Sequence, residues 1–279
     1  MKIRTVGIVG QGFVGSALTK VFSCYNRVYT YDKAHKQLST HTSVSALSHS
    51  CDVVFVCVPT PMRPDGSCDT SIVEKVCLEA CGTGRQNIIV IKSTVPPGTT
   101  AKINDICVDS QVVFNPEFLL ERNAEEDFRN TSRVILGGPR PATTRLRQFY
   151  TRVFPKAQII KTDSTIAEFV KYLINSFLAA KVSIANEFSS LCREKGVDYD
   201  KVIEYAVHDE RLGSSHWAVP GPDGLLGFGG SCFPKDLNAL IQIAEESGVS
   251  CNTLKGAWET NLQVRPEKDW EQLKGRAVQ

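Results

Sequence analysis

The sequence predicts an α/β fold: a doubly wound parallel sheet of the Rossmann type, followed by a long helix and a small all-helical domain. Three observations support this. Strand and helix patterns alternate from the N-terminus to about residue 163. A glycine-rich turn joins the first strand to the first helix, and a long run of apolar residues at spacings of three and four begins near residue 165.

The composition is that of an ordinary soluble protein, with 42% apolar and 22% charged residues in a chain of 279. A formal net charge of +2 favours neither nucleic acid nor an acidic membrane surface, so we expect a small-molecule ligand. The longest apolar runs, such as 53–58, are too short to span a bilayer. The N-terminus enters directly into a strand pattern without a leader, which predicts a cytoplasmic protein.

Ten cysteines are scattered along the chain without a Cys-x-x-Cys pair and without histidines at ligand spacing. We therefore expect no metal site. In a reducing cytoplasm these cysteines are expected to be free thiols, most of them acting as small apolar residues.

The first strand, at 4–10, runs into residues 10–15, Gly-Gln-Gly-Phe-Val-Gly, and then into a helix at 16–22. In this context the three glycines permit the tight turn, the approach of a pyrophosphate to the backbone, and close packing of helix on strand. The helix N-terminus offers N–H groups to phosphate. The unit therefore predicts a dinucleotide site.

The second strand, at 27–31, ends at Asp32. A carboxylate at this distance accepts hydrogen bonds from the adenosine ribose and repels a 2′-phosphate, which favours NAD over NADP. The alternative is that Asp32 only forms a turn.

Further strands are predicted at 52–58, 87–93, 111–114, 133–136 and 157–161, with a helix at 71–81, so that an NAD-binding domain covers 1–163. Three strands end in distinctive turns: residues 59–61, Pro-Thr-Pro; 93–99, Ser-Thr-Val-Pro-Pro-Gly-Thr; and 115–121, Asn-Pro-Glu-Phe-Leu-Leu-Glu. Since such sheets bind ligands beyond the carboxyl ends of their strands, these turns are candidate site segments. Simple punctuation by proline is the alternative for the first of them.

A single helix is predicted from about 165 to 194, ended by Gly196. It is expected to form a spine between domains and a dimer contact. Glu168, Lys171 and Asn175 lie on one face of it, although Glu and Lys at this spacing also form solvated surface pairs. With helices at 199–207, 237–246 and 253–264, the helical domain covers 164–264, and 265–279 is a tail.

Residues 227–236, Gly-Phe-Gly-Gly-Ser-Cys-Phe-Pro-Lys-Asp, set Cys232 among small residues, a lysine and an aspartate. The segment indicates a thiol presented to a ligand. A tight turn with a buried cysteine is the alternative.

Together these motifs resemble the UDP-glucose/GDP-mannose dehydrogenase family over residues 2 to about 273, with Glu168-x-x-Lys171-Tyr172-x-x-Asn175 and Arg211-Leu212-Gly213 in the expected order. The resemblance implies NAD-dependent oxidation of a nucleotide sugar's primary alcohol to a carboxylate, in a homodimer. UDP-glucose is the expected substrate.

By that resemblance Cys232 is the nucleophile, Lys171 and Asn175 hold the oxygen at the reacting carbon, and Asp236 and Thr94 position a water. Glu117 and Glu121 lie by the substrate and act in acid–base steps. The residues expected to bind the cofactor are Gly10, Gly12, Phe13, Val14, Gly15, Asp32, Lys33, Thr60, Thr94, Glu121 and Lys235, and those expected to bind the substrate are Glu117, Phe118, Leu119, Glu121, Lys171, Asn175, Arg211, Phe228 and Gly229.

The chain departs from the family pattern in four places. Arg122 replaces a usual glycine, and Gln37 replaces a lysine, which leaves Lys33 or Lys36 to substitute. The loop 217–226 is longer than usual, and residues 274–279 look like the start of the family's third domain. Two other hypotheses therefore remain, a two-electron dehydrogenase of the β-hydroxyacid type and a non-catalytic NAD-binding remnant.

Overall fold

The computed structural model describes residues 2–119 and 121–279, so Leu120 of the third distinctive turn lies outside the described residues. The chain divides into two compact units. Unit 1 is Met1–Thr60 with Thr70–Lys171, and unit 2 is Pro61–Asp69 with Tyr172–Gln279. Unit 2 thus includes a short segment that lies between two strands of unit 1 in the sequence.

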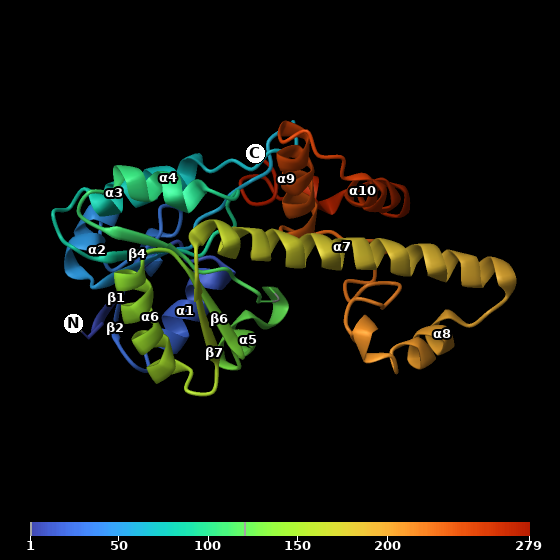
Figure 1. Cartoon of the computed structure of the whole chain (residues 1–279), viewed down its shortest axis with the longest axis horizontal. Coiled ribbons are helices and arrows are strands. Elements are labelled where there is room, and N and C mark those ends of the chain that lie inside the picture. Colours follow the sequence, from blue (N-terminus) through green and yellow to red (C-terminus); the bar gives the residue numbers. More distant parts are fainter. Residues whose placement is uncertain (1, 120) are drawn as a thin grey trace. The chain divides into compact units, whose positions relative to one another are not determined.

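Unit 1 is built on a seven-stranded sheet with the order β2-β1-β3-β4-β5-β6-β7 (Figure 1). The strands are β1 (Thr5–Val9), β2 (Arg27–Tyr31), β3 (Val53–Val56), β4 (Ile88–Ile91), β5 (Gln111–Phe114), β6 (Arg133–Gly137) and β7 (Gln158–Thr162). Neighbouring strands are parallel except β5 and β6, which pair antiparallel at Phe114 and Gly137. The predicted doubly wound fold is confirmed, with a mostly parallel sheet.

Helices cover both faces of this sheet. On one face pack α1 (Phe13–Phe22), α5 (Ala124–Arg129) and α6 (Arg140–Val153), and on the other pack α2 (Val44–Ser50), α3 (Ser71–Cys81) and α4 (Thr99–Ile106). Every residue of β3 and β4 is buried, as the continuous apolar runs of a strand covered on both faces require. The sheet therefore forms the core of unit 1 and fixes the ends of its strands.

The expectation of free thiols is wrong at one pair of cysteines. Cys81, the last residue of α3, forms a disulfide with Cys107, which follows α4, and their Cα atoms are 5.7 Å apart. The two residues are 26 positions apart in the sequence. They meet because α3 and α4 pack side by side on the same sheet face, which no local cysteine spacing indicates.

The long helix α7 (Ser164–Lys195) has 32 residues, and its residues from Tyr172 onward belong to unit 2. Gly196 follows it with a φ of +65°, a left-handed conformation that glycine adopts readily and that ends helices. The remaining helices are α8 (Tyr199–Ala206), α9 (Phe233–Glu246) and α10 (Asn252–Val264), with 3₁₀ turns η1 (Lys36–Leu38), η2 (Glu121–Asn123), η3 (Glu210–Leu212) and η4 (Asp269–Gln272).

Within unit 2, Arg265 anchors the segment that leads to α9. Its guanidinium is 2% exposed and forms ion pairs with Asp223 at 2.8 Å and Asp269 at 2.6 Å. It also donates to the carbonyl of Leu226. Because a buried guanidinium needs such partners, these contacts fix the loop just before residues 227–236.

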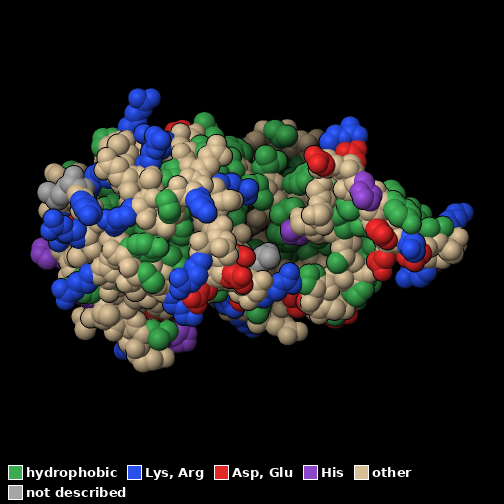
Figure 2. Space-filling model, turned by 90° about the horizontal axis from the view of Figure 1, so that it is seen from below, with side chains coloured by type: hydrophobic (Ala, Val, Ile, Leu, Met, Phe, Trp, Pro, Cys, Tyr) green, Lys and Arg blue, Asp and Glu red, His purple; other side chains and the backbone are tan. Residues whose placement is uncertain are grey.

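The surface carries charges of both signs. On the face shown in Figure 2, Lys and Arg side chains are interspersed with Asp and Glu side chains and with hydrophobic ones. This mixture agrees with the small formal net charge of +2.

Candidate functional site

The turn after β1 can be built only with glycine at two positions. Gly10 has a φ of +90°, and a Cβ there would lie 2.4 Å from the carbonyl oxygen of Cys57. A Cβ on Gly15 would lie 1.9 Å from the carbonyl oxygen of Gly10. The glycines predicted from the sequence therefore bring α1 directly against the end of β1.

Gly12 and the start of α1 leave room for a ligand. A Cβ built on Gly12 meets no atom within 4 Å, and no side chain caps the N-terminus of α1. Beside the helix lies a pocket of about 500 Å³ whose lining includes Phe13, Lys20, Glu121 and Arg122. First-turn N–H groups and open space at a helix start suit a pyrophosphate, so these residues fit a dinucleotide.

Asp32 links this turn to the next. Its carboxylate accepts hydrogen bonds from the backbone N–H of Gln11 at 2.7 Å, Ala34 at 2.9 Å and His35 at 2.7 Å. Burial tends to raise the pKa of Asp32, but these N–H groups outweigh it and hold the pKa below its usual value. Asp32 thus organises a turn, as one alternative had it, and presents an anion there; its bond to ribose stays a prediction, as does the role of exposed Lys33.

The predicted turns follow three neighbouring strands. Since β3, β4 and β5 are adjacent and parallel, their carboxyl ends lie at one edge of the sheet. Thr60 and Thr94 are buried there, and the hydroxyl of Ser93 donates to the carbonyl of Val58 at 2.6 Å, which ties the first turn to the second.

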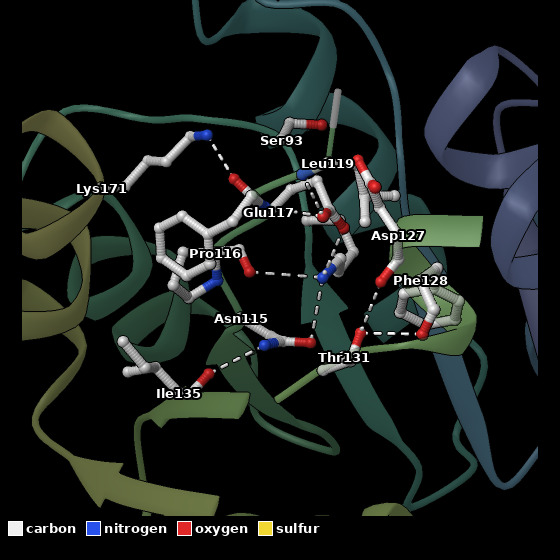
Figure 3. A network of polar contacts seen from close by, with 12 residues as sticks. Ser93, Asn115, Pro116, Glu117, Leu119, Asp127, Phe128, Thr131, Ile135 and Lys171 are labelled. Atoms are coloured by element: carbon white, nitrogen blue, oxygen red, sulfur yellow. Dashed lines mark hydrogen bonds and ion pairs between the residues drawn. The ribbon is translucent and has the colours of Figure 1, made fainter. Parts of the chain in front are cut away.

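The third turn is shown in Figure 3, with Asn115, Pro116, Glu117 and Leu119 labelled, and a buried ion pair holds it. The ammonium group of Lys92 lies 3.0 Å from the carboxylate of Glu117. That carboxylate also accepts hydrogen bonds from the backbone N–H of Phe118 at 2.7 Å and Leu119 at 3.0 Å. Glu117 is therefore fixed at both carboxylate oxygens.

The first turns of α7 bring two predicted residues to these strand ends. Lys171 donates to the backbone carbonyl of Glu117 and lies 5.3 Å from the centre of the Phe118 ring. Glu168 is buried and accepts the N–H groups of Gly98 at 2.6 Å and Thr100 at 2.9 Å. The alternative of a solvated Glu168–Lys171 pair is wrong, because both side chains are buried with backbone partners.

In unit 2, Cys232 lies immediately before the first residue of α9. It is partly buried, and the N–H of Asp236 bonds to its carbonyl at 3.0 Å. Lys235 follows three residues later, in the first turn of α9. A helix start and a neighbouring lysine are the surroundings in which reactive thiolates occur, which favours a presented thiol over a buried turn.

Behind Cys232 lies a buried polar cluster of unit 2. Asp236 pairs with Lys235 and accepts a hydrogen bond from the side-chain amide of Asn175 at 2.6 Å. Burial opposes the charge on Lys235, but Asp236, Cys68 and Cys232 raise the pKa of its amino group above the usual value. Three predicted residues, Asn175, Lys235 and Asp236, are thus in direct contact.

The remaining predicted substrate residues have other surroundings. Arg211 is exposed in η3 and pairs with Asp209 at 2.5 Å. Phe228 is buried against Phe233 and Trp258. A Cβ on Gly229 would lie 2.3 Å from a carboxylate oxygen of Asp269, so glycine is needed for packing there. Their contacts with substrate stay predictions.

Sequence reasoning missed Lys92 and Arg265, and it included Asn115 only as the first residue of a candidate site segment. A lysine directly after the apolar run of β4 was the available signal for Lys92, since a charge next to a buried strand needs a partner. For Arg265, no sequence pattern identifies its partners Asp223 and Asp269.

The described residues offer neither a metal cluster nor a membrane-spanning helix. Among residues 2–119 and 121–279, no group of three or more His, Cys, Asp and Glu side chains could hold a metal ion. No helix in the same ranges is long and apolar enough to cross a membrane.

Comparisons with known proteins match both units. Residues 25–154 match the NAD binding domain of the UDP-glucose/GDP-mannose dehydrogenase family, and residues 165–263 match its central domain. The UDP-glucose 6-dehydrogenase of Pseudomonas aeruginosa is 39% identical over 227 residues, which cover 77% of this chain and 49% of that protein.

Solved structures agree with this match. The UDP-glucose dehydrogenase of Pyrobaculum islandicum superposes with a TM-score of 0.85 at 31% identity, over 98% of this chain and 71% of that one. The 3-hydroxyisobutyrate dehydrogenase of Mycobacterium tuberculosis has a TM-score of 0.77 over 96% of this chain and 95% of that one, but at 17% identity it shares the fold alone.

The chain spans about half the length of the curated relatives that it matches. The matched N-terminal domain and the fit of the turn after β1 make NAD its cofactor. With both the NAD binding and the central domain present, the chain belongs to the UDP-glucose/GDP-mannose dehydrogenase family.

Proposed function

We propose that the chain oxidises the primary alcohol of a nucleotide sugar, UDP-glucose foremost, to a carboxylate through a covalent intermediate on Cys232. The observation that carries the proposal is the position of Cys232 at the start of α9, beside the Lys235–Asp236 pair. The names of the relatives, UDP-glucose 6-dehydrogenases, support the substrate class.

The residues account for a reaction in two oxidations. Bound NAD supplies the hydride acceptor for each. An aldehyde loses hydride poorly, but attack by the Cys232 thiolate gives a thiohemiacetal whose carbon carries an oxyanion, and its oxidation gives a thioester that water hydrolyses. A covalent step of this kind divides one difficult oxidation into two easier reactions.

The other site residues are assigned to stabilising the oxyanion, orienting the water and transferring protons. Lys171 and Asn175, one turn apart on α7, donate to the oxyanion at both stages, a role in which a single donor contributes about 3 kcal/mol. Asp236 and Thr94 orient the hydrolytic water. Glu117 and Glu121 take and return protons beside the substrate.

The experiment is NADH release on a panel of UDP- and GDP-sugars, with the stoichiometry measured. We expect about two NADH per sugar oxidised, because a thioester route needs two hydride transfers. The Cys232→Ser variant should form no acid, whereas Cys24→Ser, at an exposed free cysteine, should match the parent. Undiminished acid formation by Cys232→Ser contradicts the proposal.

The same panel separates the two other hypotheses. One NADH per turnover with Cys232 dispensable indicates a two-electron dehydrogenase of the β-hydroxyacid type. NAD binding without turnover on any sugar indicates a non-catalytic remnant.

We also propose a homodimer formed through α7. An apolar stripe runs along its unit 2 portion, made by Leu173, Phe177, Ile184, Phe188 and Leu191. Leu173 and Phe177 are 65% and 63% exposed, and exposed stripes of this kind mark association surfaces. The spacings of three, four and seven place all five on one helix face, which a second copy of α7 matches.

The cytoplasm is the location we propose, on the ground that the reactants are a nucleotide sugar and NAD. The Cys81–Cys107 disulfide is unusual for that compartment. Fractionation of cells that produce the protein, with the redox state of these two cysteines measured, tests the location.

A further inference from the structure

Lys92 is a buried cation at the end of β4, and the mechanism above does not use it. It directly follows the fully buried run Ile88–Ile91, and only 4% of the residue is exposed. Moving an ammonium group out of water is costly unless other groups compensate its charge and satisfy its donors. The groups that contact Lys92 therefore indicate which part of the structure this buried charge holds in place.

The polar contacts of this ammonium group go to one turn. It lies 3.0 Å from a carboxylate oxygen of Glu117, 3.2 Å from the side-chain carbonyl of Asn115 and 3.4 Å from the backbone carbonyl of Pro116. The ammonium group donates hydrogen bonds to the Asn115 and Pro116 oxygens, and its charge pairs with that of Glu117. Lys92 thus binds three consecutive residues that follow β5.

The turn is also anchored on its other side. The hydroxyl of Tyr150, on α6, donates to the side-chain carbonyl of Asn115 at 2.6 Å, and the Asn115 amide donates to the carbonyl of Ile135 at 2.8 Å. Because these hydrogen bonds are buried, they hold the Asn115 side chain in place. Lys92 then connects Glu117 to this fixed side chain.

Glu117, once held in this way, supplies the acceptor for the ammonium group of Lys171. Its carboxylate is held by Lys92 and by two backbone N–H groups, while its own backbone carbonyl accepts the ammonium group of Lys171. Figure 3 shows that Lys171 reaches the backbone carbonyl of Glu117 on the side that faces away from the Glu117 carboxylate. A shift of the Glu117 backbone therefore moves the acceptor that orients Lys171.

We propose that Lys92 is a positioning residue: through its ion pair with Glu117 it holds the carbonyl that orients Lys171 at the reacting carbon. The inference rests on the proposed function for the role of Lys171, but the positioning itself is a property of unit 1. Without Lys92, the Glu117 carboxylate loses its buried ion-pair partner, and Asn115 and Pro116 lose the donor that they share. The turn is then less firmly held.

The first test measures how firmly the Lys171 amino group is held, and it does not require catalytic turnover. Lys171 acylation by acetic anhydride is followed by mass spectrometry in the parent, Lys92→Met and Glu117→Gln. We expect Lys171 to react about threefold faster or more in both variants, since a released donor exchanges its partner for solvent. The control Lys75→Met removes an exposed lysine of α3 and should leave the rate unchanged. Unchanged protection in folded Lys92→Met and Glu117→Gln overturns the proposal.

The second test is kinetic and uses a double-mutant cycle. We expect Lys92→Met to lower kcat about tenfold or more, with KM changed less than about twofold, because the lost orientation affects the reacting group. Since Lys92 acts through Glu117, the double variant should be no slower than the slower single variant. Additive losses, or a loss confined to thermal stability, contradict the proposal.

The two tests separate the claims. If the parent turns over no nucleotide sugar while Lys171 becomes reactive in both variants, the proposed function fails and the positioning by Lys92 holds. If turnover is normal and Lys171 protection does not respond, the positioning fails alone.

Discussion

Glu168 and Glu117 at the strand ends of unit 1, and Asp236 in unit 2, are buried carboxylates held by backbone groups or by an opposite charge. Glu168 is an example: burial raises the pKa of its carboxyl group, while the N–H groups of Thr100 and Gly98 oppose that shift. Asp236 and Glu117 are each paired with a lysine. Replacing one member of such a pair should therefore lower stability mainly because its buried partner is left without a hydrogen bond or an opposite charge.

Asp32→Asn should make stability less dependent on acid pH. The folded-state pKa of Asp32 is lowered, so its stabilising contribution is present above the unfolded pKa and is lost as pH falls through the folded one. We expect the variant to be about 1–2 kcal/mol less stable at neutral pH, since three N–H bonds to an anion are replaced by weaker ones.

Urea unfolding at a series of pH values measures this difference. Far-UV circular dichroism is the suitable probe, because all three tryptophans lie in unit 2. The gap between parent and variant should begin to narrow near the ordinary aspartate pKa of about 3.9 and close only below the lowered folded-state pKa of Asp32. Asp109→Asn, at an exposed position, serves as the control. A gap that is constant with pH rules out this role for Asp32.

At the scale of elements, apolar periodicity predicted β2, β5 and α3 with their observed bounds and α7 to within one residue at each end. Four helices, α2, α4, α5 and α6, were not predicted. Three of them have eight residues or fewer, which leaves little room for an apolar periodicity. The fourth, α6, does carry a buried face at spacings of three and four, with Ala142, Leu146, Phe149 and Val153, and this pattern was overlooked. The antiparallel β5–β6 pair was also missed, because the sequence does not reveal that the segment between these strands, which includes η2 and the short α5, reverses the direction of the chain in the sheet.

Phe177→Glu should weaken the proposed dimer. A glutamate in the middle of the apolar stripe of α7 must be desolvated without a partner when two copies meet, so we expect monomers at concentrations where the parent is dimeric. Sedimentation velocity over a concentration series measures this. Val108→Glu, at a position 93% exposed after α4, adds the same charge elsewhere and should remain dimeric. A monomeric parent contradicts the proposal.

Reducing the Cys81–Cys107 disulfide should destabilise unit 1. The bond joins the ends of α3 and α4, and removing a bond that closes a loop of this size costs about 2–4 kcal/mol. Unfolding followed by circular dichroism, with and without a thiol reductant, measures the loss. The stability of the Cys81→Ala/Cys107→Ala variant should not change when the reductant is added. If the stability of the parent does not change either, the disulfide does not stabilise the fold.

For the whole molecule, the sequence predicted the α/β class, NAD and the family, because glycine positions and strand ends are local signals with a physical cause. Contacts between distant side chains were not predictable in the same way. Lys92 with Glu117, Arg265 with Asp223, and Cys81 with Cys107 each depend on where the fold brings separate elements. The match to about half of each curated relative leaves the choice of sugar to experiment.

The central claim is that Cys232 carries the sugar as a thioester. The direct measurement is intact-protein and peptide mass spectrometry after rapid acid quenching of a reaction with UDP-glucose and NAD. The account predicts a sugar adduct on the peptide that contains Cys232, present during turnover and absent from Cys232→Ala. Acid formation at the parent rate by Cys232→Ala, with no adduct in either protein, would contradict it.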